Sequence, residues 1–234
     1  SSDVCSPDLL VAAVVLAVAA ARRPALAQAA DAPAVDAAFA RFWEAASPTE
    51  ALAAADAVVR SGVTFDAALA RLKTGRPYAA TVPVGVVSKR HHLGPYDFQY
   101  QIDVPPTYTP ARQYQVRVQL HGGVGRDNPS PRGNGIGPLA GVEQIYVLPT
   151  AWSDAPWWND VQIENLRAIL DTVKRTYNVD ENRVVLSGVS DGGTGTYYVA
   201  MQETTPFASF QPMNGSMMVL SNDQIGVDGD LYPT

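Results

Sequence analysis

A short segment in the second half of the chain combines a serine with two glycines at a spacing typical of a catalytic nucleophile. An apolar run, residues 183–187, leads into Gly188-Val189-Ser190-Asp191-Gly192. When a strand turns this tightly into a helix, the central serine adopts a strained backbone conformation, and glycines are needed where a Cβ would collide with neighbouring elements. We therefore interpret Ser190 as a nucleophile beside a helix N-terminus, which favours the negative charge that forms when a serine attacks a carbonyl.

A second segment with suitable chemistry is His121-Gly122-Gly123, which follows a predicted strand at residues 114–120. Two adjacent glycines let main-chain N–H groups approach a substrate oxygen without obstruction by side chains. This is the requirement of an oxyanion hole, in which N–H donors bind the oxygen of the tetrahedral intermediate. We expect Gly122 and Gly123 to contribute to such a hole.

Two further groups of residues have side chains that could bind a ligand: three tryptophans that could contact a substrate, and a pair of histidines that could bind a metal ion. Trp152, Trp157 and Trp158 follow a predicted strand at residues 144–148, at the end where open α/β sheets bind ligands. The sequence leaves open whether these tryptophans bind an acyl, phenolic or sugar group or are simply packed. His91 and His92 lie in a predicted connection between strands; without a third ligand at suitable spacing, solvated turn residues are favoured over a metal pair.

The elements that position these residues follow from periodicity. Residues 31–78 predict a small helical prefix, with Ser47-Pro48-Thr49-Glu50 as a capping box and Thr64 as the cap of a further helix. Residues 79–234 predict a catalytic domain in which strands alternate with helices. The expected strands are 82–88, 97–104, 114–120, 144–148, 183–187 and 207–213, and the expected helices begin near Asn159 and Gly192. This alternation implies a mostly parallel sheet with helices on both faces.

The composition limits the classes of partner. The net charge of −6 and the absence of a basic cluster argue against nucleic acid, and no stable membrane span is expected. Residues 1–30 contain an apolar run, Leu9 to Ala21, which is followed by small residues. We interpret residues 1–30 as a secretory signal or a stray N-terminal segment. A buried or membrane-anchoring helix is the alternative. The single cysteine, Cys5, lies in this segment, so a mature secreted or periplasmic form would have no disulfide or cysteine metal site.

On these residues the chain resembles α/β-hydrolases, in particular secreted serine esterases of the polyhydroxybutyrate-depolymerase and feruloyl-esterase-like group. The resemblance covers roughly residues 82–234 and rests on the two glycine motifs and on the approach Tyr177-Asn178-Val179-Asp180 to Arg183. The resemblance implies that Ser190 is the nucleophile and that the main-chain N–H groups of Asp191 and of Gly122 or Gly123 are the oxyanion donors. It also implies that a small or polymeric ester is cleaved through an acyl-enzyme, without a metal or an organic cofactor. A carboxylate after the nucleophile departs from the family pattern. Asp191 is expected either to point to a donor in a neighbouring loop or to contact a polar substrate group.

The resemblance also implies an acid and a histidine after the serine, and no position here matches them. All three histidines precede Ser190, and Asp223, Asp228 and Asp230 lie in a loop with no strand before them. The sequence therefore predicts a fold incomplete at the C-terminus and a fragment without turnover. A prolyl-oligopeptidase-like serine peptidase and a catalytically inactive α/β-hydrolase domain used for binding remain as alternatives.

Overall fold

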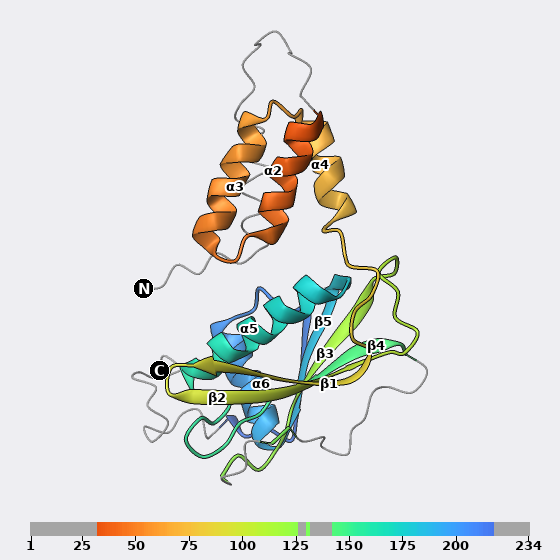
Figure 1. Cartoon of the computed structure of the whole chain (residues 1–234). Helices are drawn as coiled ribbons and strands as arrows, with labels where there is room; N and C mark the ends of the chain where they lie inside the picture. The colour runs from red at the N-terminus through yellow and green to blue at the C-terminus, as the bar shows by residue number, and fades with distance from the viewer. Residues whose placement is uncertain (1–31, 126–129, 132–141, 218–234) are drawn as a thin grey trace. The chain divides into compact units, whose positions relative to one another are not determined.

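The computed structural model describes residues 32–125, 130–131 and 142–217 of the 234-residue chain. The chain divides into two units, residues 1–77 and 78–234 (Figure 1). The predicted signal segment with Cys5, and the three aspartates after Ser190, lie outside the described residues. Among the helices that the structure describes, none is long and apolar enough to cross a membrane.

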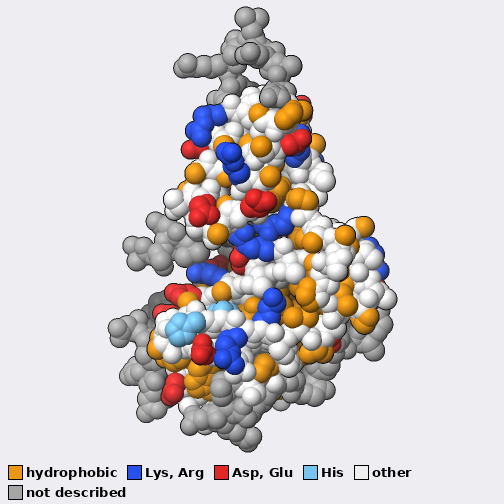
Figure 2. All heavy atoms as spheres, in the orientation of Figure 1, with side chains coloured by type: hydrophobic (Ala, Val, Ile, Leu, Met, Phe, Trp, Pro, Cys, Tyr) orange, Lys and Arg blue, Asp and Glu red, His pale blue; other side chains and the backbone are white. Residues whose placement is uncertain are grey.

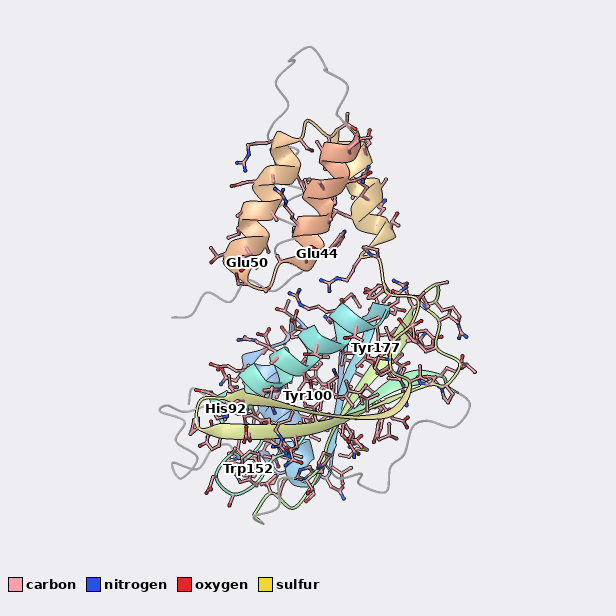
Figure 3. All side chains as sticks on the ribbon, in the orientation of Figure 1. Glu44, Glu50, His92, Tyr100, Trp152 and Tyr177 are labelled. Atoms are coloured by element: carbon pink, nitrogen blue, oxygen red, sulfur yellow. The ribbon has the colours of Figure 1, made fainter. Side chains whose placement is uncertain are left out.

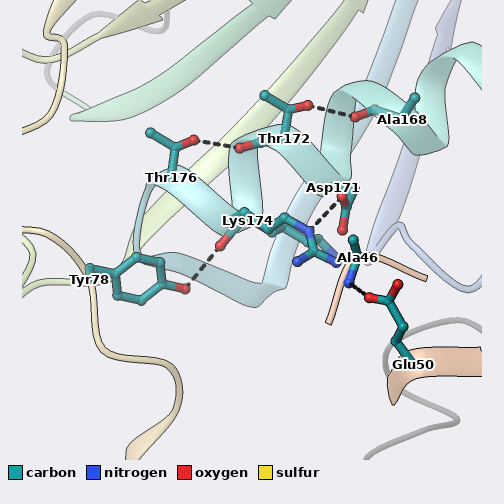
Figure 4. Close-up of polar contacts among 9 residues, drawn as sticks. Ala46, Glu50, Tyr78, Ala168, Asp171, Thr172, Lys174 and Thr176 are labelled. Carbon is teal, nitrogen blue, oxygen red and sulfur yellow. Dashed lines mark hydrogen bonds and ion pairs between the residues drawn. The ribbon is translucent and has the colours of Figure 1, made fainter. Parts of the chain in front are cut away.

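The described part of the first unit is helical, as the sequence predicts. Its helices are α2 (Ala32–Glu44), α3 (Pro48–Arg60) and α4 (Phe65–Thr74). Ser47 Oγ accepts a hydrogen bond from Glu50 N (3.2 Å), and Thr64 Oγ1 accepts one from Ala67 N (3.3 Å), so both predicted caps are confirmed. The Glu50 carboxylate accepts from Ala46 N at 2.8 Å (Figure 4), one residue before the amide that an ideal capping box uses.

This unit has a hydrophobic core of its own, in which alanine is the commonest residue. Small side chains let helices approach closely, and the larger aromatic residues fill the remaining space. The buried members are Val35, Ala38, Phe39, Phe42, Ala45, Ala51, Ala54, Ala55, Val58 and Ala68.

A six-stranded sheet forms the centre of the second unit. Its strands are β1 (Gly85–Leu93), β2 (Tyr96–Val104), β3 (Tyr114–Leu120), β4 (Gln144–Leu148), β5 (Val179–Val189) and β6 (Ser209–Met213). In space their order is β1-β2-β4-β3-β5-β6. The pairs β1–β2 and β2–β4 are antiparallel, whereas β4–β3, β3–β5 and β5–β6 are parallel. The sheet is therefore mixed and mostly parallel, and β1 lies at one edge of it.

Helices α5 (Asp160–Thr176) and α6 (Asp191–Gln202) share one hydrophobic core with the sheet. Alternate residues of β3, including Val116 and Val118, point into this core, where they meet the apolar face of α5. Tyr100 lies there too, between β2 and α5 (Figure 3). The last turns of α5 are reinforced by Thr172 and Thr176, whose hydroxyls donate to carbonyls four residues earlier (Figure 4).

Polar side chains occupy the alternate positions of the central strands. Arg117 Nε donates to Ser187 Oγ at 3.1 Å, and Ser187 Oγ donates to Gln119 Oε1 at 2.7 Å. All three residues are buried. They partner one another across β3 and β5, which removes the cost of burying unpaired polar groups.

Both ends of the first strand differ from the sequence prediction. The first predicted strand, 82–88, is instead β1 at Gly85–Leu93, so His91 and His92 lie within a strand and not in a turn. The chain turns at Gly94, whose φ of 57° suits a tight hairpin. The charged and polar residues of β1 are tolerated because an edge strand is partly solvated. Because of these residues, β1 lacks the apolar pattern by which a strand is predicted from sequence.

Candidate active site

Ser190 lies between the end of β5 and the first residue of α6, in a backbone conformation that few non-glycine residues adopt. Its φ is 58° and its ψ is −122°. Ser190 N donates to Met213 O of β6 at 2.9 Å, and Thr194 N donates to Ser190 O at 3.0 Å. Strain of this kind typically costs about 1–3 kcal/mol and persists only where the surroundings enforce it.

The glycines on either side of Ser190 are required by direct contact between main chains. A Cβ on Gly188 would lie 2.0 Å from Gly192 O, and a Cβ on Gly192 would lie 2.1 Å from Leu120 O. No side chain fits at either position without moving the backbone. The spacing read from the sequence therefore reflects how closely β3, β5 and α6 approach one another.

Gly122 brings the segment after β3 against the serine. A Cβ placed on Gly122 would lie 3.0 Å from Ser190 Cβ and 3.6 Å from Ser190 Oγ. Of the residues that the structure describes, none accepts a hydrogen bond from the main-chain N–H of Gly122, Gly123 or Asp191. The predicted oxyanion donors therefore lie on the two segments that meet at Ser190, and within the described residues their N–H groups have no acceptor.

His121 has a structural role that the sequence analysis did not identify. Its Nε2 lies 3.1 Å from Ala151 N, which can only donate, so Nε2 is the unprotonated nitrogen. The proton is therefore on Nδ1, which donates to Gly122 O at 2.9 Å. His121 is buried and both ring nitrogens are engaged, so it is a neutral support of the glycine segment and not a base for Ser190.

The carboxylate of Asp191 is turned to the segment after β3. Asp191 Oδ2 accepts a hydrogen bond from Val124 N at 2.9 Å. Of the two orientations considered from the sequence, the one toward a donor in a neighbouring loop is confirmed.

The three tryptophans do not form one wall. Trp157 has no exposed surface, and its Nε1 donates to His121 O at 2.7 Å, so the expectation that it lines an open site is wrong. Trp152 packs against Phe98 and Tyr96, with ring centroids 5.3 and 5.8 Å away. Trp158 is partly buried against the core. A binding role for Trp152 and Trp158 stays a prediction.

His91 and His92 are separated by the alternation of the strand. His92 Nδ1 lies 3.1 Å from Asp97 Oδ1 at the surface, where Figure 2 shows histidine among acidic and basic side chains. His91 packs between Phe98 and Tyr100, with ring centroids 5.8 and 5.6 Å away. Burial lowers the pKa of His91, and the nearby Asn165 side chain opposes that shift. Adjacent strand residues point to opposite faces, which argues against a metal pair.

A general base is absent from the part of the chain that the structure describes. His121 is engaged, and His91 and His92 lie on β1, which β2, β4 and β3 separate from β5. Within the same described ranges, no group of three or more His, Cys, Asp or Glu is arranged to hold a metal ion. The described residues thus place a strained, exposed serine against a glycine segment, and they do not place a histidine and an acid beside it.

Comparisons with known proteins find two curated relatives of part of the chain. No family model matches the chain. It is 45% identical over 75 residues to a bifunctional acetylxylan esterase/xylanase of Neocallimastix patriciarum, an alignment covering 30% of this chain and 11% of the relative. It is 26% identical over 128 residues to a probable feruloyl esterase C of Aspergillus terreus, covering 51% of this chain and 47% of the relative. The chain thus spans less than half the length of either curated relative.

Among solved structures, an acetyl xylan esterase from Aspergillus awamori aligns over 62% of this chain and 58% of its own, with 17% identity and a TM-score of 0.47. The second unit has the α/β-hydrolase fold, because it combines a mostly parallel mixed sheet with a strained serine between β5 and α6. The curated relatives that it resembles are named as esterases.

Proposed function

We propose that this chain carries the nucleophile and the oxyanion hole of a serine hydrolase that cleaves carboxylic esters. The observation that carries the proposal is the placement of Ser190 at a φ of 58°, at the start of α6 and against Gly122. A serine held this way is exposed beside N–H groups that have no acceptor among the described residues, which is the arrangement that acyl transfer requires. The esterase names of both curated relatives support the same class of reaction.

The proposed mechanism has two steps through an acyl-enzyme. A histidine removes the Ser190 proton while Oγ attacks the ester carbonyl, and the tetrahedral oxyanion is bound by N–H of Asp191 and of Gly122 or Gly123. The alcohol leaves with a proton from the histidine, and water then releases the acid by the same route. No metal or organic cofactor takes part in this mechanism.

The base and the acid of the triad are proposed to lie outside the residues that the structure describes. Two facts support this part of the proposal. The three histidines of the chain precede Ser190, and the ring nitrogens of His121 are engaged with Gly122 O and Ala151 N. The chain also spans 47% of the feruloyl esterase relative, which leaves room for further elements in a protein of that length. We extend the proposal to a secreted or periplasmic protein that acts on small or polymeric esters.

Acetyl and feruloyl esters are the proposed substrate classes, since the curated relatives are named for those acyl groups. Trp152 is the proposed contact for an aromatic acyl group because it is only partly buried, with Tyr96 and Phe98 behind it. A Trp152→Leu variant is expected to lose activity on a feruloyl ester while keeping activity on an acetyl ester. Equal loss on both esters would remove this assignment.

The deciding experiment compares the protein extended to its natural C-terminus with its Ser190→Ala variant on a short-chain chromogenic ester. We expect the variant to lose at least about 10³-fold in kcat. A fluorophosphonate probe should label Ser190 in the wild type, as mass spectrometry of the labelled peptide would show. Folded wild-type protein that is neither active nor labelled would contradict the proposal, and cleavage of peptides but not esters would favour a peptidase.

A further inference from the structure

We propose that the Asp191 side chain is a positioning residue that holds the two halves of the oxyanion hole in register. The proposal rests on the proposed serine hydrolase function and assigns a role to a carboxylate that this function does not need. Asp191 follows the nucleophile directly and is the first residue of α6. Its main-chain N–H is one expected donor, and its carboxylate binds the segment that supplies the other.

The contact connects parts of the chain that are distant in sequence. Val124 N donates to Asp191 Oδ2 at 2.9 Å, across 67 positions. Val124 lies two residues after Gly122, the residue in contact with Ser190. The hydrogen bond therefore joins the end of the glycine segment to the start of α6.

The start of the same segment is already fixed by other groups. Trp157 Nε1 donates to His121 O, and His121 Nδ1 donates to Gly122 O. Beyond these contacts lies Gly123, which has a φ of 73° and open space where a Cβ would be. A glycine of this kind has many accessible conformations, so it does not by itself maintain the direction of its neighbours.

The Val124 N–H belongs to the peptide plane that follows Gly123. A peptide unit is planar, so binding its N–H to Asp191 also fixes the direction of the Gly123 carbonyl. The conformation of Gly123 is then set from both sides: by His121 through the preceding peptide and by Asp191 through the following one. The preceding peptide contains the Gly123 N–H, one of the two candidate donors.

A carboxylate beside an oxyanion would oppose catalysis if it faced the developing charge. Here it is directed at a main-chain N–H and lies in the first turn of a helix, and both features stabilise a negative charge. Asparagine retains an acceptor oxygen without the charge, whereas alanine retains neither. These two replacements therefore separate a positioning hydrogen bond from an effect of charge.

The test uses the full-length protein and its Asp191→Ala and Asp191→Asn variants. Asp66→Ala is the matched control, because Asp66 is an exposed carboxylate in the first turn of α4. Three quantities are measured: kcat and KM on a chromogenic ester, affinity for a boronic acid that forms a tetrahedral adduct with serine, and hydrogen exchange of the peptide covering residues 121–125.

We expect Asp191→Ala to lower kcat about 10- to 100-fold, since loss of a whole donor typically costs 10²–10³-fold. KM should stay within about 3-fold, because ground-state binding does not depend on the oxyanion contact. Affinity for the boronic acid should fall with kcat, and exchange at residues 121–125 should accelerate. Asp191→Asn should recover most of the kcat, of the affinity for the boronic acid and of the protection from exchange. Asp66→Ala should match the wild type in all three quantities.

The proposal would be overturned if Asp191→Ala had the same kcat as the wild type and the same rate of hydrogen exchange at residues 121–125. Equal impairment of the Ala and Asn variants would also overturn it, because the charge and not the accepting oxygen would then matter. Inactive wild-type protein would contradict the proposed hydrolase function, and the exchange measurement would still decide whether Asp191 holds the glycine segment.

Discussion

The indole of Trp157 donates its Nε1–H to the main-chain carbonyl of His121 at 2.7 Å, and the two rings pack edge to face with centroids 5.1 Å apart. Both residues are buried. The tryptophan thus fixes the residue immediately before Gly122, so the direction of the glycine segment depends on a side chain that lies below the surface of the site.

Replacing Trp157 by phenylalanine is expected to keep most of the volume and remove the donor. The His121 carbonyl would lose its partner in a buried position, at a cost of about 1–3 kcal/mol in the free energy of unfolding. Activity on a chromogenic ester should fall as well, because the glycine segment loses an anchor. Urea unfolding and kcat check both effects. Trp43→Phe, at a partly buried position of the helical unit, is the control and should change neither by a comparable amount.

The two nitrogens of His121 can be tested separately. An asparagine amide approximates Nδ1 and can still donate to Gly122 O, whereas a glutamine oxygen approximates Nε2 and can still accept from Ala151 N. Both variants should be destabilised by about 1–3 kcal/mol, because one buried partner is lost in each. We expect His121→Asn to keep the higher kcat, since its contact adjoins the oxyanion donors. A higher kcat for His121→Gln would contradict the role assigned to Nδ1.

Gly122→Ala places a methyl group 3.0 Å from Ser190 Cβ, a separation tighter than normal packing allows. The nucleophile or the glycine segment must shift, and we expect kcat to fall about 10-fold or more, because small misplacements of reacting groups are costly. Gly125→Ala is the control, since no atom of the described residues lies within 4 Å of its added methyl group. Thermal unfolding of both variants, measured beside their kcat values, separates a catalytic effect from a loss of fold.

The pKa of His91 makes stability depend on pH. Burial lowers the pKa of His91 in the folded state, whereas the unfolded chain titrates near the ordinary value of about 6.5. Between these values the unfolded state binds more protons, so stability falls as the pH decreases below about 7 and levels off below the folded pKa. His91→Gln removes this contribution. Urea unfolding at several pH values from 7.5 to 5 should show a smaller loss for the variant, and identical losses would contradict the assignment.

The sequence predicted those parts of the fold that local pattern determines. The bounds of β3 and β4 agree with the predicted strands 114–120 and 144–148, because each is an apolar run between breaking residues. The caps at Ser47 and Thr64 were also predictable, since a cap depends on neighbours within three residues. Strand β1 was misplaced because an edge strand with two charged residues lacks an apolar signal.

The supporting contacts of the candidate site could not be predicted in the same way. The His121 ring meets Ala151, 30 positions away, and Val124 meets Asp191, 67 positions away. No local signal marks such pairs. Gly195 is a similar case: within a helix it reads as a weak residue, yet a Cβ there would lie 2.2 Å from Trp157 Cβ. Its absence of a side chain is what lets α6 approach the tryptophan.

The position of β1 at the edge of the sheet has a consequence for behaviour in concentrated solution. An edge strand offers main-chain donors and acceptors to a second molecule, and the exposed Val86 would favour such pairing. Lys89 and Arg90 follow on the same strand, and two like chains would bring these cations together. The repulsion between these cations disfavours the intermolecular sheets through which β-rich proteins aggregate. The same charged residues that removed the apolar pattern of this strand therefore also disfavour fibril-like association.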